Sequence, residues 1–167
     1  HFLNYLSIRA NEHTSSIHFL NRQEHYRDYS YENLWKDIQK YASYLKQQAI
    51  QPGDVVSIIL PTCEEFLAAF FALQALKAIP VASYPPTSLM DLSNWNKRTK
   101  QQLDQVNGKH IITDKRINRV ISNSIIGKDT HVHLIEEINS LTDFSFEINL
   151  KNYGEEDACF LQFSSGS

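Results

Sequence analysis

The stretch Ala158-Cys-Phe-Leu-Gln-Phe-Ser-Ser-Gly-Ser167 passes directly from an apolar run into small hydroxyl residues around one glycine. An apolar run bounded by a turn signal is typical of a buried strand. The loop that follows suits a phosphate, because small side chains let backbone N–H groups approach the ligand and hydroxyl groups donate further hydrogen bonds. A flexible serine-rich tail is the alternative. The four candidate binding residues are Ser164, Ser165, Gly166 and Ser167.

The composition is that of a single globular domain. With 167 residues, of which 42% are hydrophobic and 21% charged, the chain can bury a sizeable core. Its net charge of -3 argues against a nucleic-acid surface, which would be basic. No apolar run reaches the length of a membrane span and the N-terminus has no signal-peptide pattern, so we expect a cytoplasmic protein. Because the sequence begins with His1 and stops abruptly at Ser167, we expect a piece of something longer.

Expected strands and helices alternate along most of the chain. The run Val55 to Leu60 is continuously apolar, which indicates a strand covered on both faces, as in a parallel sheet. The alternation predicts an α/β fold, with a largely parallel sheet, helices packed on both faces and a short antiparallel lead-in. In such sheets ligands bind beyond the carboxyl ends of the strands, where the loop after Phe163 would lie. The expected strands are 16–20, 26–29, 55–60, 79–82, 110–113, 131–135 and 158–163. The expected helices are 2–10, a helix of about five turns that begins after residue 30, an apolar helix that ends at residue 76, 91–106 and a short helix that begins after residue 114.

Short sequence signals mark the ends of these elements. Ser30 is a good N-cap, with Glu32 placed to interact with the helix dipole. Thr62 to Glu65 has the spacing of a capping box. Pro80 inside an expected strand indicates an irregular or edge position, because proline cannot donate a hydrogen bond to a sheet.

Histidines and cysteines are candidate metal ligands, but their spacing does not favour a metal site. His131 and His133 would share one face of a strand, with no third ligand nearby. Cys63 and Cys159 lie far apart in the sequence and are interpreted as small core residues. We therefore expect neither a metal site nor a disulfide.

The terminal stretch resembles the start of the phosphate-loop signature of the adenylate-forming enzymes, in which an apolar strand precedes Ser/Thr-Ser-Gly-Ser/Thr. Leu161-Gln-Phe-Ser-Ser-Gly-Ser167 matches the first half of that signature. The superfamily includes acyl-CoA synthetases, fatty acyl-AMP ligases, nonribosomal peptide adenylation domains and luciferases. Three further stretches are similar to its N-terminal region, in the right order: Tyr29-Ser-Tyr-Glu-Asn-Leu34, Gln51-Pro-Gly-Asp-Val-Val-Ser-Ile-Ile-Leu60 and Ala75-Leu-Lys-Ala-Ile-Pro-Val-Ala-Ser-Tyr-Pro-Pro86.

The end of the last stretch, Tyr84-Pro85-Pro86, is similar to the fatty acyl-AMP ligases. Two positions depart from the superfamily pattern. A glycine usually precedes the Pro-Gly-Asp turn, where Ala49 stands, and another usually precedes the second strand, where Lys77 and Ala78 stand. Both positions are structural, and the resemblance covers nearly the whole chain.

The resemblance implies that residues 1–167 are the N-terminal part of an AMP-binding domain, an incomplete subdomain that ends inside the phosphate-binding loop, with the C-terminal lid domain absent. It implies a fatty acyl-AMP ligase that uses ATP and Mg²⁺ to convert a fatty acid into an acyl-adenylate and pyrophosphate. The acyl group would then pass to an acyl carrier protein or to a polyketide or peptide synthase. The residues that would bind the nucleotide phosphates are Ser164, Ser165, Gly166 and Ser167.

Other functions stay open at this point. The catalytic residues of the superfamily lie beyond Ser167, so none is assigned and the segment alone is expected to be inactive. A fragment of an acyl-CoA synthetase or of a peptide-synthetase adenylation domain differs chiefly at the Tyr-Pro-Pro exit. Outside the superfamily, the alternatives are a non-catalytic flavodoxin-like module that binds a phosphorylated ligand and a purely structural domain.

Overall fold

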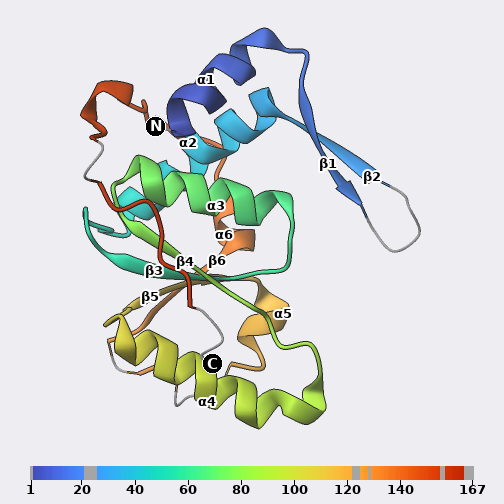
Figure 1. The fold of residues 1–167 in the computed structure, drawn as a ribbon, viewed down its shortest axis with the longest axis vertical. Helices are drawn as coiled ribbons and strands as arrows, with labels where there is room; N and C mark the ends of the chain where they lie inside the picture. Colours follow the sequence, from blue (N-terminus) through green and yellow to red (C-terminus); the bar gives the residue numbers. More distant parts are fainter. Residues whose placement is uncertain (1, 21–25, 122–124, 128, 155–156, 164–167) are drawn as a thin grey trace.

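A computed structural model describes residues 2–20, 26–121, 125–127, 129–154 and 157–163 of the chain (Figure 1). Within these residues, the centre of the molecule is a parallel sheet of four strands in the order β4-β3-β5-β6. This arrangement confirms the expected α/β fold with a largely parallel sheet. The strands are β3 Val55–Ile59, β4 Ile79–Ser83, β5 His110–Thr113 and β6 His131–Leu134.

Helices cover both faces of the sheet, as the sequence predicted (Figure 1). On one face α2 and α3 pack together, with α1 against α2 and the short, unexpected α6 beside α2, while α4 and α5 lie on the other face. None of the helices in the described ranges is long and apolar enough to span a membrane. The helices are α1 Phe2–Glu12, α2 Tyr31–Gln47, α3 Glu64–Ala75, α4 Leu92–Gln105, α5 Lys115–Asn118 and α6 Ile135–Asn139, with 3-10 turns at Leu89–Asp91 and Leu150–Asn152.

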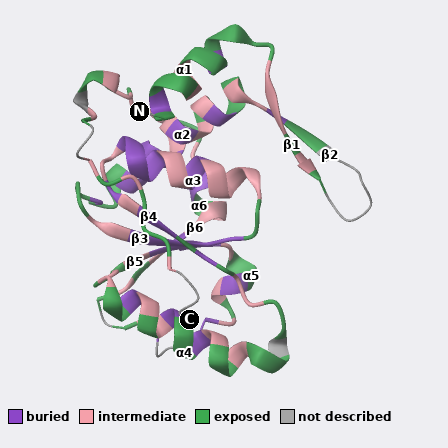
Figure 2. Cartoon of the chain, in the orientation of Figure 1, coloured by how far each residue is buried: buried purple, intermediate pink, exposed green. Residues whose placement is uncertain are grey.

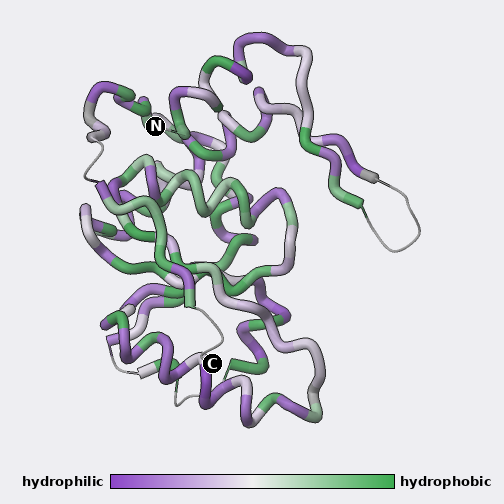
Figure 3. The backbone as a smooth tube through the Cα atoms, viewed as in Figure 1, coloured by the Kyte–Doolittle hydropathy of each residue, from purple (hydrophilic) through white to green (hydrophobic). Residues whose placement is uncertain are grey.

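Side chains of the central strands alternate between two hydrophobic cores. Val56 and Ile58 are fully buried in the core that α2 and α3 complete, whereas Ile59 is fully buried in the core on the side of α4 and α5. β5 repeats this pattern, with Ile112 in the first core and Ile111 in the second. Buried residues therefore concentrate in the strands and on the inner sides of the helices (Figure 2). The apolar course of α3 contrasts with the largely hydrophilic α4 (Figure 3).

The expected antiparallel lead-in is a hairpin of β1 Ser16–Leu20 and β2 Tyr26–Ser30. It extends away from the helices (Figure 1). The hairpin is attached to the main core through Tyr29, which is buried and whose ring centroid lies 6.3 Å from that of Phe19.

The two expected helix caps have different outcomes. The Ser30 hydroxyl accepts a hydrogen bond from the Asn33 N–H at 3.1 Å, so this N-cap is confirmed. The capping box at Thr62 is wrong, because α3 begins at Glu64 and its N-cap is Cys63. Thr62 therefore precedes the N-cap by one residue, and the Cys63 side chain makes no capping hydrogen bond.

The three long helices α2, α3 and α4 end in the same way. At each end one residue with positive φ follows the C-cap: Ala49 (φ 62°), Lys77 (φ 58°) and Asn107 (φ 50°). The next amide donates back to the carbonyl three positions before the C-cap, as in Ala78 N–H to Leu73 O at 2.9 Å, which is a Schellman motif. Ala49 and Lys77 lie in the two stretches where the resemblance to the adenylate-forming enzymes led us to expect a glycine. An L-residue in this conformation costs about 1–2 kcal/mol.

The terminal segment differs from the expected buried strand. Of its described residues 157–163, only Leu161 pairs with the sheet, through a parallel bridge to Val81 in which the Leu161 N–H donates to Pro80 O at 3.0 Å. Phe160 and Leu161 are 49% and 40% exposed, because the segment lies along the outer edge of β4. Pro80 is thus on an edge strand, as predicted, and its missing N–H faces this outer edge rather than β3.

The cap assignment can be tested by a matched pair of substitutions. Ser30→Ala should lower the free energy of unfolding by about 1 kcal/mol, because it leaves the first turn of α2 without its acceptor. Thr62→Ala should change it by less than about 0.5 kcal/mol, because Thr62 is exposed and outside α3. Urea unfolding followed by circular dichroism measures both values. Equal losses for the two variants would contradict the assignment of Cys63 as the N-cap.

Candidate functional site

The strand order places a topological switch point between β3 and β5. From β3 the chain crosses to β4 on one side, returns to β5 on the other side and continues outward to β6. In doubly wound sheets the ligand crevice lies beyond the carboxyl ends of the two strands at which this reversal occurs. Here the buried Thr113 hydroxyl donates to Ile59 O at 2.9 Å and ties these two strand ends together.

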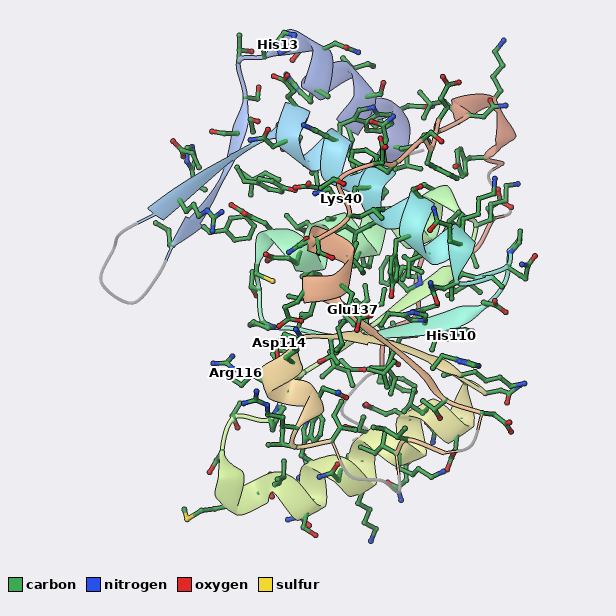
Figure 4. The ribbon with its side chains drawn as sticks, turned by 180° about the vertical axis from the view of Figure 1, so that it is seen from behind. His13, Lys40, His110, Asp114, Arg116 and Glu137 are labelled. Carbon is green, nitrogen blue, oxygen red and sulfur yellow. The ribbon has the colours of Figure 1, made fainter. Side chains whose placement is uncertain are left out.

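The polar groups just beyond β5 are already engaged with each other. The Asp114 carboxylate accepts from the Ile117 N–H at 2.6 Å, and the Glu136 carboxylate accepts from the Lys115 N–H at 3.0 Å. Figure 4 shows Asp114 and Arg116 at this carboxyl end of β5 and His110 at its amino end. The free N–H groups at the start of α5 are therefore bound by the chain's own carboxylates.

The exit from β4 lies at the same end of the sheet. Ser83 is buried, whereas Tyr84 is 88% exposed and begins the extended Tyr-Pro-Pro exit that the sequence predicted. The Trp95 indole N–H donates to Tyr84 O at 2.7 Å, which anchors this exit to α4. The exit therefore has a defined course from β4 to α4.

The terminal segment runs parallel to β4 through the Leu161–Val81 bridge. Its described residues therefore run in the direction of the carboxyl ends of the strands, the end at which Tyr84 and Asp114 lie. The predicted binding residues themselves lie outside the described residues, so their part in a site stays a prediction. They are Ser164, Ser165, Gly166 and Ser167.

A polar hollow of about 330 Å³ lies between β2, α2 and the start of α3. Two of its carboxylates are engaged: Arg27 Nε lies 2.8 Å from the Glu64 carboxylate, and the Tyr29 hydroxyl donates to the Asp37 carboxylate at 2.7 Å. Burial, together with Asp37, raises the pKa of Tyr29, and burial raises the pKa of Glu64. Sequence reasoning did not anticipate this hollow, because its residues come from three separate elements.

Cys63 and Cys159, interpreted from the sequence as small core residues, are both free thiols. Both are half-buried. Burial raises the pKa of the Cys63 thiol to about 11, so this thiol is protonated at neutral pH and is a poor nucleophile.

Three histidines gather at the amino end of the sheet, away from the switch point. His110 is the register partner of His131, and its Nδ1 lies 3.1 Å from Nε2 of His133. Within the described part of the chain, no group of three His, Cys, Asp or Glu residues is arranged to hold a metal. Burial first, and then the neighbouring imidazoles of His110 and His131, lower the pKa of His133 to about 4. Burial also lowers the pKa of His110.

Comparison with known proteins gives one family for nearly the whole chain. The family model described as AMP-binding enzyme matches residues 6–167. Curated protein sequences give no match.

Solved structures with the same fold come from several kinds of adenylate-forming protein. A structure from a study of fatty acyl-adenylate ligases of E. coli and L. pneumophila superposes with a TM-score of 0.84 at 22% identity, over 99% of this chain and 30% of that one. McyG A-PCP complexed with phenylalanyl-adenylate gives a TM-score of 0.84 at 18% identity, over 98% of this chain and 26% of that one. O-succinylbenzoate coenzyme A synthetase from Bacillus subtilis, in complex with AMP, gives 0.75 at 19% identity, over 98% and 39%. The chain thus spans well under half the length of these proteins.

The histidine pair predicts a loss of stability in mild acid. Buried His133 stays neutral in the folded state down to a pH of about 4, whereas an unfolded histidine takes up a proton near pH 6.5. The unfolded state therefore binds more protons between these values, and stability falls as the pH is lowered from 6.5 to 4, by up to about 3 kcal/mol for this group. His133→Phe should flatten the decline in this window, as measured by the midpoint of urea unfolding at each pH. A decline equally steep in the variant would show that other groups cause it.

Proposed function

The chain belongs to the AMP-binding enzyme family, and from this we propose that it is the N-terminal part of a fatty acyl-AMP ligase. The complete protein would activate a fatty acid with ATP and pass the acyl group to an acyl carrier protein, free or within a polyketide or peptide synthase. Residues 1–167 would then form the first part of the AMP-binding domain. A cytoplasmic location, where ATP is supplied, agrees with this proposal.

The observation that carries the proposal is the course of the terminal segment. Leu161 aligns parallel to β4, so the hydroxyl-rich residues that follow Phe163 would enter the carboxyl end of the sheet, beside the switch point between β3 and β5. A site for nucleotide phosphates at this end agrees with the family and with the residue types of Ser164 to Ser167. The Tyr84-Pro85-Pro86 exit supports the fatty acyl-AMP ligase branch of the family.

The proposed reaction transfers an adenylyl group. A fatty-acid carboxylate oxygen attacks the α-phosphorus of ATP, and the bond from that phosphorus to the oxygen bridging to the β-phosphate breaks. The products are the acyl-adenylate and pyrophosphate, which takes the bonding electron pair. Hydroxyl and backbone N–H groups of the terminal loop would hold the β- and γ-phosphates and stabilise the negative charge that develops on pyrophosphate.

Mg²⁺ is implied by the family, and its chemistry would be to neutralise phosphate charge. Asp114 and Glu136 at the carboxyl end of β5 accept backbone N–H hydrogen bonds, and within the described residues no group of three His, Cys, Asp or Glu side chains is arranged to hold a metal. No step is therefore assigned to a metal held by these residues.

One observation favours a second candidate function. Counted from β3, the order β4-β3-β5-β6 is the 2-1-3-4 order of flavodoxin-like folds. A non-catalytic module of this kind would bind a phosphorylated ligand at the same switch point. It would bind without turnover in any form of the protein, which separates it from a ligase.

The 167-residue chain alone should not form an acyl-adenylate, because it spans 30% of the fatty acyl-adenylate ligase structure and lacks the rest of such an active site. Fatty-acid-dependent exchange of labelled pyrophosphate into ATP measures this reaction. The full-length protein should exchange and the isolated chain should not. Exchange by the isolated chain would contradict the assignment, and its absence in both proteins would favour the binding module.

In the full-length protein, Ser165→Ala should lower kcat/KM for ATP about tenfold, because a hydroxyl donor to a phosphate is lost. Ser93→Ala, on the exposed surface of α4, is the matched control and should leave it unchanged. The acceptor is identified by measuring acyl transfer to a carrier-protein thiol and to coenzyme A. Faster transfer to coenzyme A would indicate an acyl-CoA synthetase.

A further inference from the structure

The C-terminal end of α3 is joined to the terminal segment at several points. We define the tethered segment as residues 153–154 and 157–161. It begins in contact with the C-terminal end of α3 and reaches the outer edge of β4 at Leu161. The Tyr153 hydroxyl donates to Ala75 O at the last residue of α3. Lys77 Nζ lies 3.1 Å from the Asp157 carboxylate and 5.9 Å from the centre of the Tyr153 ring.

Gln74 adds a buried contact farther along the tethered segment. Gln74 is only 3% exposed. Its side-chain amide nitrogen donates to Cys159 O at 2.9 Å and contacts Cys159 Sγ at 3.1 Å. The other amide atom, Oε1, is buried and has no hydrogen-bond partner among the residues that the structure describes. A buried unpaired oxygen lowers stability, so packing of α3 alone does not account for a glutamine at this position. Its hydrogen bond to the tethered segment does.

Lys77 occupies a backbone position that favours glycine. Ala49 and Asn107 hold the equivalent positions after α2 and α4, so the strained conformation is common to all three helix ends. Of the three, Lys77 alone carries a side chain that reaches the tethered segment as an ion pair. The Gly154 N–H and then the Lys77 ammonium hold the pKa of Asp157 below its usual range, so this partner is charged at neutral pH.

We propose that Gln74 and Lys77 are positioning residues that hold the tethered segment against the edge of β4, and that this attachment strengthens the binding of ATP by the hydroxyl-rich residues that follow in the sequence. We call these two residues the α3 clamp. The inference rests on the proposed function, since it assigns the loop to ATP. The clamp acts at a distance from ATP, through the Leu161–Pro80 hydrogen bond that precedes the loop.

The geometry explains why a clamp is needed at this place. The only backbone pairing of the tethered segment with the sheet, within the described residues, is at Leu161. One such hydrogen bond on an exposed edge is easily opened. Phe160 adds an aromatic contact, with its ring centroid 5.9 Å from that of Phe70, but remains half exposed. The side-chain contacts from α3 therefore supply most of the attachment.

Hydrogen exchange of the Leu161 amide tests the clamp in the 167-residue chain. Lys77→Gly removes the ammonium and relieves the strained backbone, so the melting temperature should stay the same or rise while Leu161 exchanges about three- to tenfold faster. Ala49→Gly is the matched control, because it relieves the same strain without removing an ion pair. It should leave the exchange of Leu161 unchanged.

Two further variants separate the clamp from the backbone change. Asp157→Asn removes the ion pair without altering residue 77, and Gln74→Leu removes the hydrogen bond to Cys159. Each should also accelerate Leu161 exchange about three- to tenfold relative to amides in β3. If Leu161 exchanges at the wild-type rate in all three variants, the clamp does not exist.

Kinetics of the full-length protein test its role in positioning the loop. Lys77→Gly and Asp157→Asn should raise KM for ATP about fivefold in pyrophosphate exchange and leave KM for the fatty acid unchanged. A merely structural role would lower the amount of active protein, and so the rate, without moving KM for ATP. An unchanged KM for ATP beside accelerated Leu161 exchange would overturn the positioning role. A wild-type protein with no exchange activity would instead reject the proposed function, while the amide measurement still decides whether the clamp exists.

Discussion

Burial of β3 on both faces is the constraint on which the rest of this structure depends. Val56 and Ile58 enter one core and Ile59 enters the other, and all three are fully buried. A strand of this kind is stable only between two helical layers with a paired strand on each side. The placement of α2 and α3 on one face and α4 and α5 on the other follows from it. The switch point follows as well, because β4 and β5 take the two sides of β3.

The connections around β3 are short because the helix ends are compact. Schellman motifs at Ala49, Lys77 and Asn107 turn the chain directly from α2, α3 and α4 toward the next strand. The strain energy at these non-glycine residues is small compared with the free energy that each helix gains by burying apolar surface. Gly108, beside Asn107, has a different reason: a Cβ there would lie 3.2 Å from a Leu103 side-chain carbon. Close packing, rather than backbone conformation, makes a glycine suitable at that position.

The end of α3 links this framework to the candidate site. Gln74 and Ala75 in the last turn of α3, and Lys77 just after it, contact the tethered segment. The segment follows the edge of β4. Lys77 has positive φ, a conformation that favours glycine, and from this position its ammonium reaches Asp157. The same sheet edge that Pro80 leaves without an N–H donor offers the carbonyl that binds Leu161. Fold and candidate site thus share one set of contacts.

The sequence by itself determined the order of the elements, the doubly buried β3, the N-cap at Ser30 and the family, because each depends on residues close together in the chain. Periodicity and capping are local, so they can be identified without a structure. Only the tertiary structure decided that α3 begins after Cys63, that the terminal segment is an exposed edge rather than a buried strand, and that His110 meets His133. It also decided that Gln74 and Lys77 hold residues about eighty positions farther along the chain, from Asp157 to Cys159. Such contacts depend on how separate elements pack against each other. Every residue type except proline has a backbone N–H, so the sequence does not mark which residue pairs with a sheet edge. No local pattern could therefore reveal these contacts.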